Sequence, residues 1–156
     1  MSILQPPSIG RSNGPGSSSR RTRSPLLPER RRQRLVLIVD DLSDQRELYA
    51  GYLAYLGYRV EEASGGVEGI AKAIELLPDL IIMDLAMPGL DGFDATRVIK
   101  AVSLTKGIPV VALTAHGEHL PREWATLAGC DVYLRKPILP GDLAAEIDRV
   151  LRKRSN

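Results

Sequence analysis

The stretch Leu35-Val-Leu-Ile-Val-Asp-Asp41 gives the clearest indication of the fold. Five apolar residues are followed at once by two carboxylates. Two later stretches repeat the pattern, Leu80-Ile-Ile-Met-Asp84 and Ile108-Pro-Val-Val-Ala-Leu-Thr114. A short apolar run without alternation is typical of a parallel strand that is buried on both faces. The pattern therefore predicts three central strands, each with a polar residue directly after its last apolar residue.

Helix-like segments and two weaker strand-like segments separate and follow these runs. Strands are predicted over 35–39, 58–63, 80–83, 108–113 and 131–134, and helices over 44–56, 67–77, 91–102, 118–128 and 141–152. Strands that alternate with helices form a parallel sheet with helices on both faces. The mixed or short segments 58–63 and 131–134 suit the sheet edges, which gives the strand order 2-1-3-4-5. The predicted fold is an α/β doubly wound parallel sheet of five strands flanked by five helices.

The first predicted helix has signals at both ends. Asp44 is the expected N-cap, Glu47 is its capping-box partner, and Gly57 follows the last turn. Apolar side chains at 48, 52, 55 and 56 have helical spacing. We therefore expect this side of the helix to pack against the rest of the domain, and we interpret Tyr49, Tyr52 and Tyr55, at a spacing of three, as helix-packing residues.

Charge is distributed unevenly along the 156 residues. Residues 1–34 hold eight arginines and one glutamate, a net charge of +7, whereas residues 35–156 carry −5. The first segment is rich in Pro, Gly, Ser and Arg and has no apolar periodicity. This composition predicts a disordered arm, followed by a domain over 35–153 and a tail over 154–156. Two interpretations of the arm stay open, a solvated tail without a partner and weak contact with nucleic acid or an anionic surface.

Composition excludes several classes of protein. The single cysteine, Cys130, excludes an internal disulfide and a multi-cysteine metal site. Two histidines exclude a histidine-rich zinc centre, and no apolar run has the length of a membrane span. Aromatic residues make up only 4% of the chain, which is few for stacking nucleic-acid bases. We therefore expect a reduced, cytoplasmic domain with no membrane span.

Polar side chains are expected to meet at the carboxyl ends of the strands. Asp40 and Asp41 follow the first strand, Asp84 the third, Thr114 the fourth and Lys136 the fifth. Ligands of such sheets bind outside this edge, near the point where the strand order reverses. Three carboxylates and one lysine have a formal charge of −2, which a divalent cation would balance. Because oxygen ligands select Mg²⁺ or Mn²⁺, the pattern predicts a magnesium site with a role in phosphoryl transfer.

Position within this cluster assigns a role to each acid. Asp84 lies centrally, between Asp41 and Thr114, and is the predicted nucleophile that forms an aspartyl phosphate. We expect Mg²⁺ to be held by Asp41, Asp84 and the backbone carbonyl of Ala86. Asp40 is expected to act through a water molecule on the metal.

The remaining polar groups are predicted to stabilise the transferred phosphoryl group. The Lys136 ammonium would contact a phosphoryl oxygen as a point charge. The Thr114 hydroxyl and the backbone N–H groups of Leu85 and Ala86 would donate hydrogen bonds. No member of this set recognises an elaborate substrate, so the donor must supply a reactive phosphoryl group.

The sequence resembles the receiver domains of two-component response regulators over residues 35–153. Five motifs in order support the resemblance: Val39-Asp40-Asp41, Ile82-Met83-Asp84, Met87-Pro88-Gly89-Leu90-Asp91-Gly92, Leu113-Thr114-Ala115 and Gly129-Cys130-Asp131-Val132-Tyr133-Leu134-Arg135-Lys136-Pro137. It implies a flavodoxin-like, chemotaxis-receiver-like fold in a stand-alone response regulator. It also implies phosphorylation of Asp84 by a sensor histidine kinase or phosphotransfer protein, and magnesium on Asp40 and Asp41.

The resemblance further implies a switch. The Thr114 hydroxyl would move toward the phosphate while the Tyr133 ring turns inward. The face formed by helix 118–128, strand 131–134 and helix 141–152 would then change its affinity for a separate downstream effector protein. The Lys136–Pro137 bond would be cis.

Such a domain signals and is not an enzyme with a substrate of its own, because it catalyses only its own phosphotransfer and dephosphorylation. Ala86 and His116 stand where the family tunes access of water to the phosphate. Since Ala86 has no side-chain donor to position a water molecule, we expect slow self-dephosphorylation.

Three other interpretations fit parts of the sequence. A flavodoxin-type mononucleotide binder needs an anion-binding loop after the first strand, where Asp40-Asp41-Leu42-Ser43-Asp44 would repel a phosphate. A haloacid-dehalogenase-like phosphohydrolase needs a second aspartate two residues after its nucleophile, where Ala86 stands. A receiver-like scaffold that is never phosphorylated is disfavoured because all five key residues are present, but it stays open.

Overall fold

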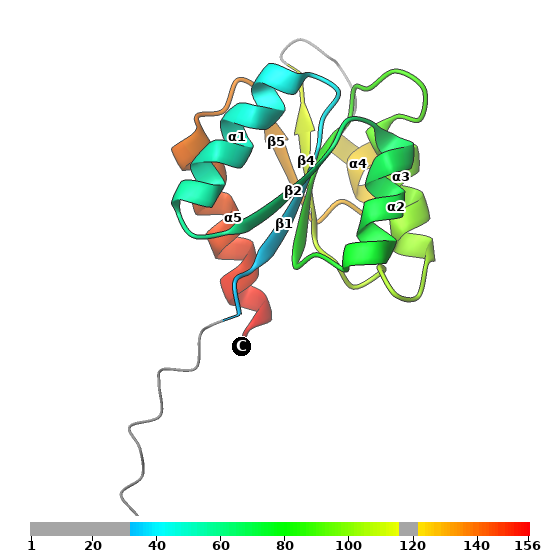
Figure 1. The fold of residues 1–156 in the computed structure, drawn as a ribbon. Coiled ribbons are helices and arrows are strands. Elements are labelled where there is room, and N and C mark those ends of the chain that lie inside the picture. The colour runs from blue at the N-terminus through cyan, green and yellow to red at the C-terminus, as the bar shows by residue number, and fades with distance from the viewer. Residues whose placement is uncertain (1–31, 116–121) are drawn as a thin grey trace, which may run out of the picture. The chain divides into compact units, whose positions relative to one another are not determined.

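The computed structural model describes residues 32–115 and 122–156 (Figure 1). Residues 1–31 of the predicted arm, His116 and the start of the helix predicted over 118–128 lie outside the described residues. The elements are β1 (Leu35–Val39), α1 (Ser43–Tyr55), β2 (Arg59–Ala63), α2 (Gly66–Leu76), β3 (Leu80–Asp84), α3 (Gly92–Ala101), β4 (Val110–Thr114), α4 (Arg122–Ala128), β5 (Val132–Arg135) and α5 (Pro140–Arg154). Among the described helices, none combines the length and apolar character needed to cross a membrane.

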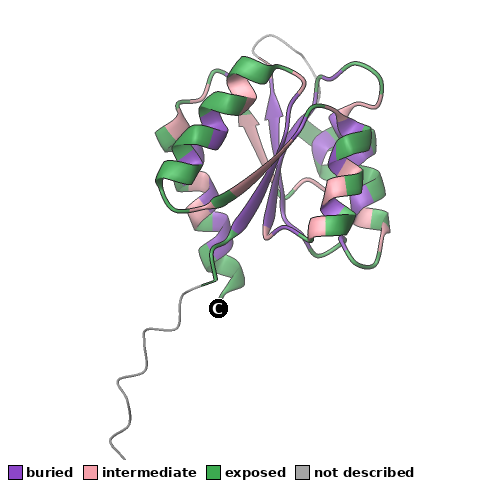
Figure 2. Ribbon diagram, viewed as in Figure 1, coloured by how far each residue is buried: buried purple, intermediate pink, exposed green. Residues whose placement is uncertain are grey.

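Five parallel strands form one sheet in the order β2-β1-β3-β4-β5, which confirms the predicted topology. β1, β3 and β4 are buried along their whole length, whereas the edge strands β2 and β5 are mostly half-buried (Figure 2). The register pairs Val39 with Met83, and Asp84 with Leu113. The residues at the carboxyl ends of the three central strands therefore lie at nearly the same level of the sheet.

Helices cover both faces of the sheet (Figure 1). α1 and α5 lie on one face, and α2, α3 and α4 lie on the other. Val36 and Ile38 of β1 pack into the core on the α1 and α5 side, while Leu37 and Val39 pack into the core on the opposite side. Because both faces of the central strands are covered, the positions before their last residues are apolar, as the continuous runs in the sequence indicate.

The details of α1 differ from the prediction. Its N-cap is Leu42, with an extended backbone and no side-chain cap, so the predicted cap at Asp44 is wrong. Asp44 instead lies in the first turn, where its charge complements the positive end of the helix dipole. α1 buries Tyr49 and Leu53, which confirms the predicted packing of Tyr49. The side chains at 48, 52, 55 and 56 are exposed, so their predicted packing is also wrong, because apolar residues occupy more than one side of this helix.

Replacing glycine by alanine is predicted to have opposite effects on stability at two positions, Gly92 and Gly51. A Cβ on Gly92, at the start of α3, would overlap the Asp84 carbonyl oxygen and lie 2.8 Å from the Leu85 Cα. A Cβ on Gly51, inside α1, would meet nothing within 4 Å. We expect Gly92→Ala to lower the free energy of unfolding by about 3 kcal/mol, because backbone must move. Gly51→Ala should raise it by about 0.5–1 kcal/mol through helix propensity.

Urea unfolding of the two variants beside the wild type measures both effects. Gly51→Ala is the matched control, because it adds the same methyl group to a helix without a steric conflict. A Gly92→Ala protein as stable as the wild type would show that the α3 start is not closely packed on the end of β3.

Candidate functional site

Three carboxylates meet at the carboxyl end of the sheet. Asp40 and Asp41 directly follow β1, and Asp84 is the last residue of β3. One oxygen atom from each side chain lies within 4.8 Å of the other two. Asp40 is 1% exposed and Asp84 4% exposed, and Asp41 is half-buried. The structure thus brings together the three acids that the sequence predicts to form a site.

Lys136, directly after β5, supplies a positive charge to this cluster. Its Nζ lies 2.9 Å from Asp40 Oδ2 and 3.5 Å from Asp84 Oδ2. Its backbone N–H donates to the Thr114 carbonyl at 2.7 Å, which continues the pairing of β4 and β5 up to the lysine. The Lys136–Pro137 bond is cis, as the family resemblance implies.

Burial disfavours the charged forms of both Asp84 and Lys136, but only for Lys136 do the neighbouring groups outweigh it. Burial raises the pKa of Asp84 from 3.8 to about 6; the Lys136 charge opposes this effect and the Asp40 charge adds to it. Burial also disfavours the charged form of Lys136, but its hydrogen bonds and charge contacts with Asp40 and Asp84 outweigh this and raise its pKa. The lysine therefore stays protonated at neutral pH, while the Asp84 carboxylate is incompletely compensated.

This donor set fits a divalent cation. Three carboxylates converge within a few ångströms and one ammonium leaves them undercompensated. Oxygen atoms in such an arrangement are ligands that Mg²⁺ prefers, and a bound cation would compensate the negative charge of the Asp84 carboxylate. Asp40, Asp41 and Asp84 are the residues that would hold it. The backbone carbonyl of Ala86 stays a predicted ligand.

Hydrogen-bond donors near Asp84 differ in their availability. The Ala86 N–H donates to Asp84 Oδ1 at 3.1 Å. The Leu85 N–H donates to the Leu113 carbonyl at 2.9 Å, within the sheet, so its predicted role as a phosphoryl donor is wrong. The Thr114 hydroxyl is buried and, within residues 32–115 and 122–156, is the one buried side-chain polar atom without a hydrogen-bond partner. A buried hydroxyl in this state is ready to donate to an oxygen that arrives at this edge of the sheet.

Sequence reasoning missed Gln45, in the first turn of α1. Its Oε1 accepts a hydrogen bond from Lys136 Nζ at 2.8 Å. Gln45 also lines an open pocket of about 310 Å³ together with Asp84, Ala86 and Lys136. The two hydrogen-bonded residues lie 91 positions apart in the chain, so no local pattern could have identified the contact.

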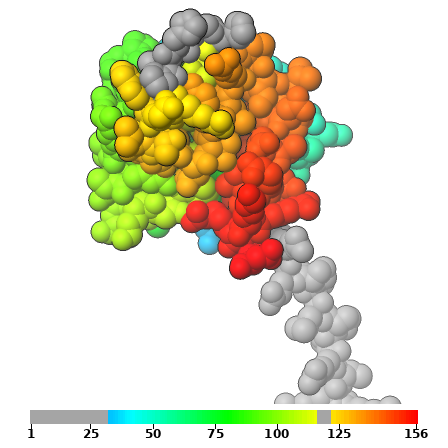
Figure 3. All heavy atoms as spheres, turned by 180° about the vertical axis from the view of Figure 1, so that it is seen from behind, coloured from blue at the N-terminus to red at the C-terminus, as the bar shows by residue number. Residues whose placement is uncertain are grey.

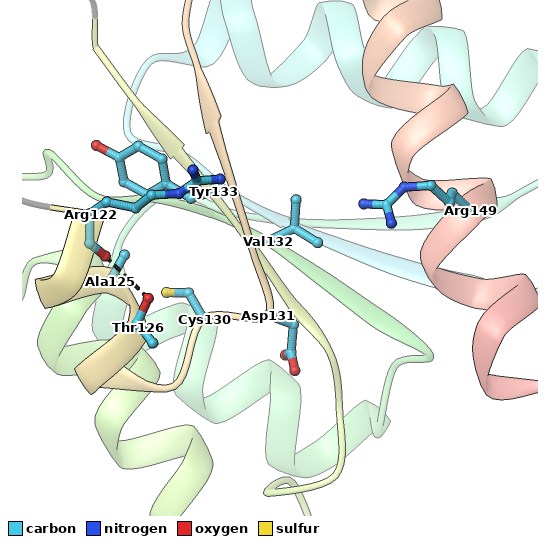
Figure 4. Close-up of a pocket in the computed structure, with 8 residues that line it drawn as sticks. All are labelled: Arg122, Ala125, Thr126, Cys130, Asp131, Val132, Tyr133 and Arg149. Atoms are coloured by element: carbon cyan, nitrogen blue, oxygen red, sulfur yellow. Dashed lines mark hydrogen bonds between the residues drawn. The ribbon is translucent and has the colours of Figure 1, made fainter.

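Tyr133, the predicted switch aromatic, lines a second hollow. This hollow of about 300 Å³ lies between α4, β5 and α5, and Arg122 and Arg149 approach it from the two sides of β5 (Figure 4). The Tyr133 ring is half-buried. α4, β5 and α5 together form one exposed face, coloured yellow to red in Figure 3. The structure thus places Tyr133 on the face where the resemblance locates the output.

Comparison with known proteins agrees with this geometry. The sequence model of the response regulator receiver domain matches residues 36–148, well over half of the chain. The chain therefore belongs to the receiver-domain family of two-component response regulators, whose members are signalling domains.

Individual relatives show how far the similarity extends. ResD of Bacillus subtilis, a transcriptional regulatory protein, is 39% identical over 77% of this chain and 49% of its own length. Protein PilH of Pseudomonas aeruginosa is 35% identical over 74% of this chain and 96% of its own length. The structure of the chemotaxis protein CheY4 of Vibrio cholerae has a TM-score of 0.72 and 32% identity, over 76% of this chain and 98% of CheY4. The chain thus spans about half of ResD but nearly the full length of PilH and CheY4.

The raised pKa of Asp84 predicts a pH-dependent gain in stability for Asp84→Asn. Because its folded-state pKa lies above its unfolded value, the ionised carboxylate destabilises the metal-free fold above about pH 6, and this effect disappears as the pH falls toward 3.8. We expect Asp84→Asn to be more stable than the wild type by about 2–3 kcal/mol at pH 8. The difference should shrink toward zero near pH 4.

Urea unfolding with a chelator present, at pH values between 4 and 8, measures this difference. Glu75→Gln, which removes an exposed carboxylate on α2, is the control and should change stability by less than about 0.5 kcal/mol at each pH. An Asp84→Asn protein less stable than the wild type at pH 8 would contradict the electrostatics described above.

Proposed function

We propose that the chain accepts a phosphoryl group on Asp84, with Mg²⁺ bound, from a sensor histidine kinase or phosphotransfer protein. The observation that supports this most is the convergence of Asp40, Asp41 and Asp84 within 4.8 Å, with Lys136 3.5 Å from Asp84. A purely structural cluster would not need three acids beside one cation, because undercompensated buried charge destabilises a fold.

The proposed transfer is a single displacement at phosphorus. A carboxylate oxygen of Asp84 forms the new O–P bond, and the P–N bond to the donor histidine breaks, so the imidazole nitrogen keeps that electron pair. Bound Mg²⁺ would supply charge neutralisation for the phosphoryl oxygens. Lys136 contributes a positive charge beside Asp84, and Thr114 contributes a buried hydroxyl donor. With a pKa of about 6, Asp84 is mostly ionised and able to attack at neutral pH.

The proposed output is a change in partner binding. The Thr114 hydroxyl, which has no partner in the described structure, would donate to the added phosphoryl group. Tyr133 on the neighbouring strand would respond by turning inward, as the family resemblance implies. The face of α4, β5 and α5 would then bind or release a separate effector protein.

The proposed domain organisation places this activity in one domain and leaves the two ends of the chain outside it. We assign the receiver domain to residues 35–153 and a short tail to 154–156, whose first residue, Arg154, is also the last residue of α5. Residues 1–34 are assigned to a basic arm with a net charge of +7. Any contact of this arm with nucleic acid or an anionic surface should weaken steeply as salt increases.

Mass spectrometry tests the phosphorylation directly. After incubation with acetyl phosphate and Mg²⁺, the wild type should gain one labile adduct of about 80 Da, the mass of an added phosphoryl group. Asp84→Asn and chelation of the metal should each abolish the adduct. Glu75→Gln is the matched control and should be modified like the wild type. A wild type that stays unmodified by acetyl phosphate and by a panel of histidine kinases would favour a non-phosphorylated scaffold instead.

The absence of a polar side chain at Ala86 predicts a long-lived phosphoryl group. We expect the phosphorylated wild type to lose its adduct over minutes or longer, because no side chain at this position orients a water molecule. Ala86→Asn introduces an amide at the rim of the pocket and should shorten the lifetime. Loss of the adduct is followed by mass spectrometry after removal of the donor. A wild-type half-life of seconds would contradict the prediction.

A further inference from the structure

The ammonium of Lys136 is held off-centre between its acceptors. It has three N–H donors, and its acceptors are Gln45 Oε1 at 2.8 Å, Asp40 Oδ2 at 2.9 Å and Asp84 Oδ2 at 3.5 Å. The shortest of these contacts is to a neutral amide, and the longest is to a buried carboxylate. Since carboxylates attract an ammonium more strongly than amides do, charge alone would place the lysine closer to Asp84. The two nearer acceptors, the Asp40 carboxylate and the Gln45 amide, therefore offset part of this attraction.

The position of Gln45 is fixed by the contacts of α1. Arg46, the next residue, donates from Nη1 to the Asp40 carbonyl at 2.7 Å. Tyr49, one turn after Gln45, donates its hydroxyl to the Ile138 carbonyl at 2.9 Å. Residues four apart share one side of a helix, so α1 contacts the segment after β5 at two points one turn apart. These bonds hold the first turns of α1, and with them Gln45, beside Asp40 and the segment after β5.

We propose that Gln45 is a positioning residue for phosphoryl transfer, and this role rests on the proposed function of Asp84. Its amide oxygen holds the Lys136 ammonium away from Asp84 before the reaction. The carboxylate then keeps its ability to attack, and the ammonium gains its full contact only when phosphoryl oxygens arrive. An interaction that strengthens in the transition state accelerates the reaction, whereas one already made in the ground state does not.

Gln45→Leu tests this role, because leucine is of similar size but accepts no hydrogen bond. We expect the rate of Asp84 phosphorylation by acetyl phosphate, at saturating Mg²⁺, to fall about tenfold, the rate equivalent of one hydrogen bond to a charged group. Glu47→Leu, which places the same side chain at an exposed position of α1, is the control and should stay within about twofold of the wild type.

A double-mutant cycle separates positioning from a general structural effect. If Gln45 acts through Lys136, Gln45→Leu should change the rate of a Lys136→Met protein by less than about twofold. Equal slowing in both backgrounds would overturn the proposal. A crystal structure of Gln45→Leu gives an independent measurement and should show Lys136 Nζ closer to Asp84 than 3.5 Å. An unmoved ammonium would also overturn it.

The outcomes distinguish this inference from the function on which it rests. A wild type that is never phosphorylated overturns the proposed function. Phosphorylation of the wild type and of Gln45→Leu at equal rates overturns only the role of Gln45.

Discussion

The structure depends on a lysine that holds two buried carboxylates together. Asp40 and Asp84 are almost fully buried, and Lys136 is the cation in contact with both. Removing such a lysine would leave two charges without compensation inside the fold, a change that typically destabilises proteins by about 3–5 kcal/mol. Even with the lysine present, the raised pKa of Asp84 shows that compensation is incomplete. The sheet must therefore be stable enough to tolerate a buried and incompletely compensated carboxylate at its edge.

The parallel sheet provides that stability and also buries the carboxylates together. Its three central strands are buried on both faces, so their interiors exclude polar residues. The first polar side chains along the chain then appear where each strand ends. Because all strands run in one direction, those ends lie on one edge, and the register brings Asp40, Asp84 and Thr114 to adjacent levels. The polar side chains of the site thus converge because of the same burial on both faces that makes the strands apolar.

This link explains which features the sequence could predict. The apolar runs ending at Val39, Met83 and Leu113 mark the central strands and the acids that follow them, and the mixed segments 58–63 and 131–134 mark the edges. The strand order and the acid cluster could therefore both be predicted without coordinates. The buried side of α1 could not, because Tyr49 and Tyr55 differ in exposure but not in chemistry. Gln45 could not either, since its partner is 91 positions away. Contacts between a helix and a distant loop depend on tertiary geometry that local periodicity does not encode.

Two donors in the unphosphorylated site are less than fully satisfied. The Thr114 hydroxyl has no partner within the described residues, and Lys136 is 3.5 Å from Asp84, longer than its other two contacts. A buried donor without a partner costs about 1–3 kcal/mol. On the proposed function, phosphoryl oxygens on Asp84 would satisfy both donors at once. The free energy that these donors would gain on phosphorylation is of the size needed to shift a two-state equilibrium. The groups that assist phosphoryl transfer can therefore also drive the switch.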